Sequence, residues 1–152
     1  MKKYVIRKYE GNKKIEYKIK DLIVNILSVE QGHEEWRNTY LTEDYDRDNL
    51  VVLYIQDDND DVIATMSLDI EKQDSGRLRS VCCHPEYRGL GLSGDLLEGI
   101  FEVAKEMNLK KITLDTYSNM QRAIAFYHKH GFETIDEAPY GDETKYMLET
   151  AV

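Results

Sequence analysis

The sequence predicts a single domain of the α/β class, built around a mixed β-sheet. Its 152 residues match the length of one domain, and 41% hydrophobic with 32% charged residues is a globular balance that excludes a disordered or disulfide-scaffold chain. In the middle of the chain, two strand-like segments flank a turn, which indicates an antiparallel hairpin. In the C-terminal half, strand-like and helix-like segments alternate, which indicates a parallel crossover.

The N-terminal elements are predicted from the spacing of apolar residues. On both sides of the turn-forming residues 10–12, apolar and polar residues alternate, which favours a hairpin or a pair of short strands. The alternating residues are Tyr4, Ile6, Ile15, Tyr17 and Ile19. From Asp21 onward the apolar residues recur at helical spacing, and a second short helix is expected over residues 33–40.

The central elements are strands. Residues 50–55 and 62–70 are rich in Val, Ile and Leu, and the Asp and Asn residues at 57–61 between them favour a turn. A second turn at residues 74–76 precedes a strand over residues 78–82, which Pro85 prevents from continuing because proline lacks a backbone donor.

The C-terminal elements alternate between helix and strand. After Gly91, apolar residues recur every three to five positions as far as Met107, which predicts an amphipathic helix. A strand is expected over residues 111–116, a helix over 119–130 closed by Gly131, and final strands over 132–135 and 146–148.

A glycine-rich loop lies between the third central strand and the amphipathic helix. Gly89, Gly91 and Gly94 let the backbone approach a ligand closely, and the unpaired amides at the start of the helix suit a phosphate or pyrophosphate. Arg88 adds a positive charge. A plain tight turn is the alternative, and phosphate binding is favoured over it because three glycines and an arginine occur together.

The same glycines also match the dinucleotide-binding fingerprint, with Asp115 in the place of its ribose-binding acid. In the dinucleotide fold the first glycine directly follows the strand, whereas residues 83–88 intervene here. The chain is also too short after the motif for two nucleotide-binding halves. A nicotinamide oxidoreductase is therefore the less favoured interpretation.

These residues resemble the Gcn5-related N-acetyltransferase (GNAT) family. The segment 88–93 is similar to the acetyl-CoA signature of that family, although Ser93 stands where the family has Gly or Ala. A second motif downstream matches in the correct order, through Asn119, Ala123, Phe126, Tyr127, Gly131 and Phe132. The close resemblance covers residues 78–135.

The resemblance implies a fold, a cosubstrate and a set of site residues. It implies a centrally splayed sheet of six or seven strands with helices on both faces, and acetyl-CoA as cosubstrate. Residues 1–77 would form the acceptor-side half, residues 78–135 the acetyl-CoA-binding core and residues 136–152 a C-terminal strand region. The cofactor-binding residues it implies are Val81, Cys82, Cys83, Arg88, Gly89, Leu90, Gly91, Leu92, Ser93, Gly94 and Asn119.

Acetyl transfer to an amine needs a neutral amine, a donor for the oxyanion and a proton for the departing thiolate. By the same resemblance Tyr127 is the acid, and a backbone amide near Val81 or Cys82 is the oxyanion donor. The sequence leaves the general base open between water alone and four side chains, namely Asp69, Glu71, Asp74 and His84. The cysteines lack a visible base partner, so direct attack in a ternary complex is favoured over an acyl-enzyme.

The net charge and its distribution along the chain indicate which binding partners to expect. A net charge of −9 repels a phosphate backbone, so a nucleic-acid partner is not expected, and it weakly favours a cationic amine as acceptor. Residues 1–20 are locally basic, with eight Lys or Arg against two Glu. A solvated hairpin face is favoured there over a basic binding patch.

The first residues carry too many charges for a secretory signal, and no apolar stretch is long enough to span a membrane, so the expected location is the cytoplasm with no membrane partner. Cys82 and Cys83 are adjacent and would point to opposite faces of a strand, so reduced thiols are expected rather than a disulfide. No metal site is predicted.

Three matters stay open at this point. Trp36 is interpreted as a core residue or as a wall of the acceptor pocket. A non-catalytic acyl-CoA-binding or sensing domain would share the glycine loop with an enzyme. The acceptor, a small molecule or a peptide, and the oligomeric state, a homodimer included, are not determined by the sequence.

Overall fold

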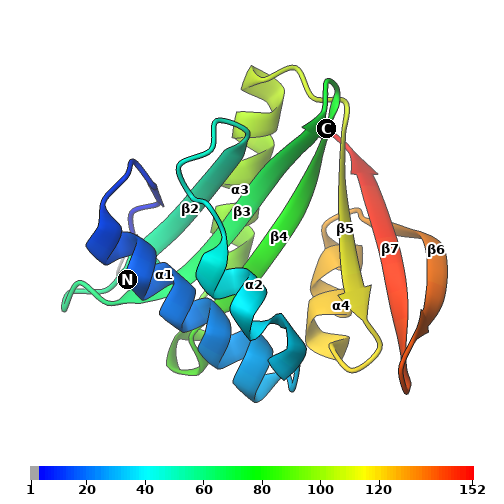
Figure 1. Ribbon diagram of the computed structural model, residues 1–152. Helices are drawn as coiled ribbons and strands as arrows, with labels where there is room; N and C mark the ends of the chain where they lie inside the picture. Colours follow the sequence, from blue (N-terminus) through cyan, green and yellow to red (C-terminus); the bar gives the residue numbers. More distant parts are fainter. Residues whose placement is uncertain (1–3) are drawn as a thin grey trace.

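A computed structural model describes residues 4–152 and contains one seven-stranded sheet with the strand order β1-β2-β3-β4-β5-β7-β6 (Figure 1). The strands are β1 (Arg7–Lys8), β2 (Leu50–Gln56), β3 (Val62–Lys72), β4 (Ser75–Cys83), β5 (Lys111–Tyr117), β6 (Glu133–Tyr140) and β7 (Glu143–Ala151). Among the strands of residues 4–152, only β4 and β5 pair in parallel, so the predicted α/β class and mixed sheet are confirmed. The strand order differs from that of a dinucleotide-binding fold.

The predicted N-terminal hairpin is wrong in its second half. β1 pairs antiparallel with β2, but the chain then enters a helix, α1 (Lys13–Ile23). The side chain of Asn12 caps this helix by accepting hydrogen bonds from the amides of Lys14 and Ile15, at 2.9 and 3.1 Å. Tyr17 is 73% exposed while Ile19 is fully buried, which a strand face shared by both residues would not allow.

The basic residues from Lys13 onward therefore lie on a helix and not on a hairpin face, whereas Arg7 and Lys8 form β1. Lys13 pairs with Asp46 at 2.5 Å, and Lys20, which is buried, pairs with Glu16 at 2.9 Å. Lys18 donates to the carbonyl oxygen of Asp60. Lys2 and Lys3, which contribute to the predicted basic patch, lie outside the described residues.

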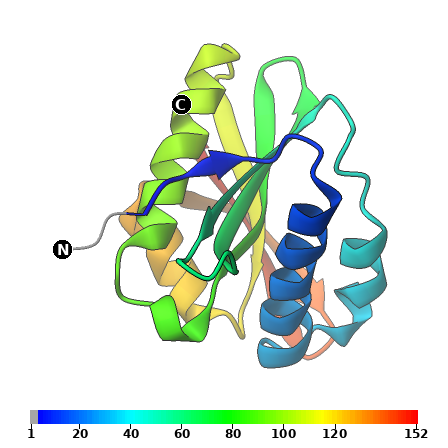
Figure 2. The same cartoon turned by 90° about the vertical axis from the view of Figure 1, so that its left-hand side faces the viewer.

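Helices cover both faces of the sheet (Figure 2). On one face α1 continues into the wider turns of the π-helix η1 (Val24–Glu30) and is followed by the 3-10 turn η2 (Glu34–Trp36) and α2 (Arg37–Thr42). On the other face lie α3 (Leu92–Glu106) and α4 (Gln121–Lys129). The short helix expected over residues 33–40 and both C-terminal helices are thus confirmed, with small shifts of their ends.

Each layer of helices has its own apolar core. Beneath α3, the fully buried Leu96 and Ile100 pack against Met66 and Leu68 of β3 in the first core cluster. Beneath α1, Ile19 and Ile23 belong to the second cluster. Burial of each such side chain contributes roughly 1.5–3 kcal/mol, which fixes both helix layers onto the sheet.

The predicted central hairpin is confirmed as β2 and β3. Its turn is held by the Asp57 carboxylate, which accepts from the amides of Asn59 and Asp61 at 2.9 and 3.0 Å. β4 begins at Ser75, three residues before the expected start, because Gly76 lets the strand pass close to Leu68. The 3-10 turn η3 (Pro85–Tyr87) ends this part of the chain.

The centre of the sheet is splayed. β4 and β5 pair only at Ser75–Lys111, Gly76–Ile112 and Arg77–Thr113, and beyond these pairs the two strands diverge (Figure 1). A bulge accompanies the divergence: Ser80 has a φ of +54°, and the pairing with β3 shifts between Arg79 and Cys82. The predicted crossover from β4 through α3 to β5 is confirmed, and β7 then inserts between β5 and β6.

Candidate active site

The glycine loop leads into α3 as the sequence predicts. Gly89 and Gly91 have φ values of +82° and +80°, a left-handed conformation that glycine adopts without strain. A side chain at either position would project into open space, with nothing within 4 Å of its Cβ. Gly91 is also the first flanking residue of α3, and no side chain among residues 4–152 caps this end. The amides of the first turn are therefore available to an anion.

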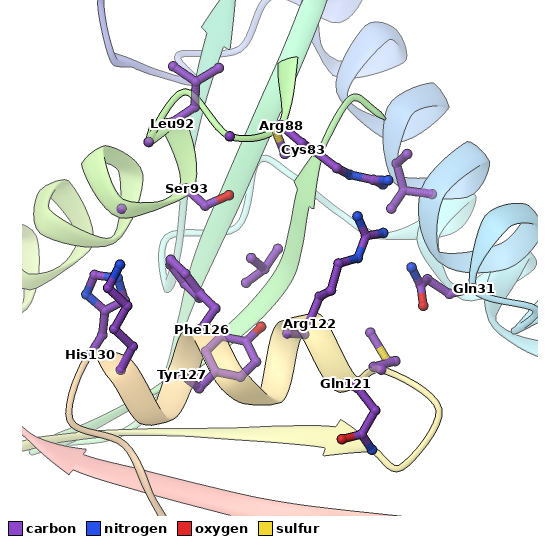
Figure 3. A pocket seen from close by; sticks show the side chains of 18 of the residues that line it. Gln31, Cys83, Arg88, Leu92, Ser93, Gln121, Arg122, Phe126, Tyr127 and His130 are labelled. Atoms are coloured by element: carbon purple, nitrogen blue, oxygen red, sulfur yellow. The ribbon is translucent and has the colours of Figure 1, made fainter. Parts of the chain in front are cut away.

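A cavity of about 750 Å³ opens beside this loop, between α3, α4 and the end of β4 (Figure 3). Ten of the twelve site residues predicted from the sequence line it. They are Val81, Cys83, Arg88, Gly89, Gly91, Leu92, Ser93, Gly94, Asn119 and Tyr127. The side chains of the other two, Cys82 and Leu90, lie elsewhere: Cys82 is buried in the second core cluster, and Leu90 is 58% exposed.

A second cavity of about 220 Å³ lies in the splay between β4 and β5, on the side of α1 and α2. Trp36 and Tyr40 contribute to its walls, together with Asp115 and Tyr117 of β5. Trp36 also packs against the second core cluster, so its interpretation as a core residue is confirmed, and its place in an acceptor pocket stays a prediction. Four residues line both cavities, namely Leu27, Val81, Met120 and Tyr127. The two cavities thus meet at the bulged end of β4.

Tyr127 is placed between the two cavities. It lies on α4, is 6% exposed, and directs its hydroxyl toward the larger cavity (Figure 3). Burial raises the pKa of its phenol well above the usual value of about 10, with a smaller contribution from Cys82. The hydroxyl therefore keeps its proton throughout the neutral and mildly alkaline range.

The Acetyltransferase (GNAT) family matches residues 18–132, more than half of the chain. The chain belongs to the GNAT acetyltransferase family. The curated relative YjgM, an uncharacterised N-acetyltransferase of Escherichia coli K12, is 43% identical over 54 residues, which cover 36% of this chain and 32% of that protein. The match therefore spans about a third of the length of the relative.

Solved structures share the fold along most of the chain. An acetyltransferase of the GNAT family from Staphylococcus aureus Mu50 superposes with a TM-score of 0.80 and 18% identity, covering 97% of this chain and 99% of that one. A proposed streptothricin acetyltransferase from Bacillus anthracis strain Ames, solved with acetyl coenzyme A, superposes with a TM-score of 0.66 and 22% identity, covering 74% of this chain and 72% of that one.

Both cysteines of this GNAT family member are free thiols. Burial raises the pKa of Cys82 far above its normal value, and it also raises the pKa of Cys83, which lines the larger cavity. Because the thiolate is the nucleophilic form of cysteine, neither side chain is activated for attack. Within residues 4–152, no three His, Cys, Asp or Glu side chains gather as a metal site would require.

The four side chains considered as general base are all engaged or remote. Asp69 accepts two hydrogen bonds of 2.9 Å from Arg47, and Glu71 pairs with Arg77 at 2.8 Å. His84 Nδ1 accepts from the amide of Glu86, and Asp74 lies in the exposed turn before β4, away from both cavities. In the part of the chain that the structure describes, none of the four lines either cavity.

Asn119 connects the entrance of α4 to the segment after α1. Its Oδ1 lies 3.2 Å from His33 Nε2, and its amide donates to the carbonyl of Gln31. His33 in turn stacks on Trp36 with ring centroids 3.8 Å apart. Asn119 therefore orders the loop between η1 and η2 as well as lining the larger cavity.

Arg122 is a functional candidate that the sequence analysis missed. Its guanidinium approaches that of Arg88 from the opposite side of the larger cavity (Figure 3), and both contact Glu30 Oε1, at 3.5 and 2.5 Å. Arg122 precedes Phe126 by four residues on α4, so helical spacing alone would have placed it on the cavity side.

No helix in the described part of the chain combines the length and the apolar character needed to cross a membrane.

Proposed function

We propose that this protein transfers the acetyl group of acetyl-CoA to a primary amine in a ternary complex. The observation that carries the proposal is the meeting of two cavities at Tyr127 and Val81. The larger cavity would hold the cofactor and the smaller one the amine, so that the two reactants meet at the end of β4.

The residues of the larger cavity fit acetyl-CoA. The uncapped first turn of α3 and the guanidinium of Arg88 suit the anionic diphosphate. The backbone from Val81 to Cys83 lies where β4 has left β5, and would receive the amide-bearing arm of the cofactor. Asn119 and the loop residues from Gly89 to Gly94 complete this proposed cofactor site.

Acetyl-CoA supplies a thioester, whose carbonyl carbon an amine attacks with cleavage of the C–S bond. Tyr127 would donate its hydroxyl proton to the departing sulfur, and the proton released by the amine nitrogen would restore the phenol. A backbone amide near Val81 or Cys82 would donate to the oxyanion. The raised thiol pKa values of Cys82 and Cys83 favour this direct route over an acyl-enzyme.

The proposal is tested in two steps. Calorimetric titration should give micromolar affinity for acetyl-CoA and no binding of NADH. A screen of primary amines should then release CoA thiol, detected with a thiol reagent. Binding of NADH without acetyl-CoA would overturn the cofactor assignment. Binding of acetyl-CoA without thiol release for any amine would instead identify a non-catalytic acyl-CoA-binding domain.

A further inference from the structure

The smaller cavity carries information about the acceptor. It is lined by Trp36, Tyr40 and Tyr117, by two arginines of β4, and by Asp115 and Thr116 of β5. Its volume of about 220 Å³ is below the roughly 300–1,000 Å³ of cavities that enclose drug-sized ligands. An acceptor that fills it is therefore small, or inserts only one end.

Asp115 lines this cavity and carries an unused hydrogen-bond acceptor that is buried beside it. Its Oδ2 accepts from Arg77 Nη1 at 2.6 Å and lies 3.8 Å from Lys145 Nζ. Its Oδ1 is buried and has no hydrogen-bond partner within residues 4–152, and the same is true of Thr116 Oγ1. A buried carboxylate oxygen without a donor is costly, so a donor supplied by a ligand would be bound strongly.

The positive charges of the cavity are already neutralised. Arg77 faces Glu71 at 2.8 Å in addition to Asp115, and Arg79 faces Glu43 at 3.0 Å and Asp69 at 3.1 Å. The described lining contains no other cationic side chain. Arg77 Nε, although ion-paired with Glu71, makes no aligned hydrogen bond within residues 4–152. A ligand carboxylate would therefore compete with protein carboxylates for both arginines, whereas a ligand ammonium would compete with no protein donor for Asp115 Oδ1.

The remaining walls are aromatic. The rings of Trp36 and Tyr117 lie 4.9 Å apart between centroids, and those of Trp36 and Tyr40 lie 6.3 Å apart. Such surfaces accept an apolar body and also attract an ammonium group. Hydrogen bonds hold this wall in place, since Trp36 Nε1 donates to the Tyr140 hydroxyl at 3.0 Å.

We infer that the acceptor is a small primary amine that carries a single positive charge, an apolar body and no carboxylate. Its nitrogen donates to Asp115 Oδ1 as the ammonium, loses one proton to water, and donates again as the neutral amine that attacks the thioester. Its body lies against Trp36 and Tyr40. Asp115 is thus a specificity-determining residue. The inference rests on the proposed function, because the smaller cavity is taken as the acceptor site.

Trp36 is the single tryptophan of the chain, so its fluorescence reports binding in this cavity without any turnover. Three probes are compared: 2-phenylethylamine, phenylalanine and spermidine. We expect 2-phenylethylamine to change the fluorescence at a concentration at least tenfold lower than phenylalanine or spermidine. Preference for phenylalanine or spermidine would overturn the inference.

A variant pair then tests Asp115 itself. Asp115→Asn keeps the size of the side chain and should weaken 2-phenylethylamine binding roughly tenfold or more, with an unchanged Kd for acetyl-CoA as evidence of an intact fold. Asp136→Asn, on the exposed strand β6, is the matched control and should change neither value. Equal binding of 2-phenylethylamine by wild type and Asp115→Asn would refute the role of Asp115.

The two proposals fail in different ways. Amine binding that depends on Asp115, without thiol release in the presence of acetyl-CoA, would overturn the enzymatic function and keep the cavity assignment. Thiol release with amino acids or polyamines but not with 2-phenylethylamine would keep the function and overturn the acceptor class.

Discussion

Arg88 donates a hydrogen bond of 2.5 Å to Glu30 and thereby joins the glycine loop to the last turn of η1, across 58 positions of the chain. The same carboxylate oxygen lies 3.5 Å from Arg122. A single negative charge therefore stands between the two guanidinium groups nearest to the proposed diphosphate site, and it competes with an anionic ligand for both.

Removing this charge should strengthen cofactor binding. For Glu30→Gln we expect the Kd of acetyl-CoA to fall about two- to fivefold, because a partly exposed ion pair contributes up to about 1 kcal/mol, and the gain should shrink at high salt. Calorimetry at two ionic strengths measures both effects. Glu34→Gln, which removes an exposed glutamate paired with Arg37, is the control. Weaker binding by Glu30→Gln would show instead that Glu30 positions the arginines.

Ser93 lies in the first turn of α3 with its side chain toward the larger cavity (Figure 3). Glutamate at this position favours the helix, since negative charge stabilises a helix N-terminus, but it repels a diphosphate. Ser93→Glu should therefore keep the melting temperature while weakening acetyl-CoA binding roughly tenfold or more. Gln73→Glu adds the same charge at the exposed turn between β3 and β4, and its affinity should equal that of the wild type.

Tyr127→Phe removes the proposed acid and nothing else from the cavity wall. We expect kcat to fall about 100-fold or more, with little change in the Kd of acetyl-CoA. Because the phenol pKa is raised, Tyr127 should keep its proton up to about pH 10, so its ionisation should not reduce the wild-type rate in that range. Over the same range, a larger fraction of the amine becomes neutral as the pH rises. Tyr146→Phe, on a half-buried tyrosine of β7, is the control. Unchanged kcat in Tyr127→Phe would refute the acid role.

The thiols of Cys82 and Cys83 should be dispensable for acetyl transfer. Because burial raises both cysteine pKa values, Cys82→Ala with Cys83→Ala should retain kcat within roughly threefold. The acetyl-CoA Kd of the double variant serves as the fold control. If turnover disappears while cofactor binding persists, a covalent acyl-enzyme must be considered.

Asp69 stabilises the fold in a pH-dependent manner. Its two hydrogen bonds from Arg47 hold the pKa of the carboxyl below its usual value, with a further contribution from Arg79. As the pH falls, the Asp69 carboxyl is therefore protonated in the unfolded chain before it is protonated in the folded one. The contribution of Asp69 to the free energy of unfolding is complete above about pH 4 and is lost as the pH falls through the folded pKa.

Urea denaturation of Asp69→Asn checks this expectation. At pH 7 the free energy of unfolding of the variant should be about 2 kcal/mol lower than that of the wild type. This difference in the free energy of unfolding should narrow below about pH 4. Asp136→Asn, which changes an exposed residue, should show no such difference. A difference that stays constant between pH 7 and pH 3 would exclude Asp69 as the source.

The C-terminal half of the fold could be predicted because its signals are local. Glycines before an apolar helix and alternation of strand with helix depend on neighbouring residues, and the structure confirms both. The N-terminal prediction failed because Ile15 and Ile19 satisfy helical spacing as well as strand alternation. The Asn12 cap decides between the two, and its signal is a single residue.

The candidate site, like the fold, could be predicted only where its residues lie close together in the chain. The cofactor side lies in one continuous segment with its motif, and ten of the twelve predicted residues line the larger cavity. The smaller cavity, the proposed acceptor site, is assembled from residues far apart in the chain, among them Trp36, Arg79 and Asp115. Their proximity depends on the divergence of β4 from β5, which no local pattern encodes. The pairs of Glu30 with Arg88 and Arg122 were missed for the same reason.

The divergence of β4 from β5 gives the sheet an edge in its interior. An exposed outer edge invites a strand of another molecule to pair with it, which is a route to aggregation. Here the diverging end of β4 lies in the wall of the larger cavity, whose other walls come from η1, α3 and α4. The unpaired edge of β4 is therefore turned toward a ligand in that cavity, which in the proposed function is the amide-bearing arm of acetyl-CoA.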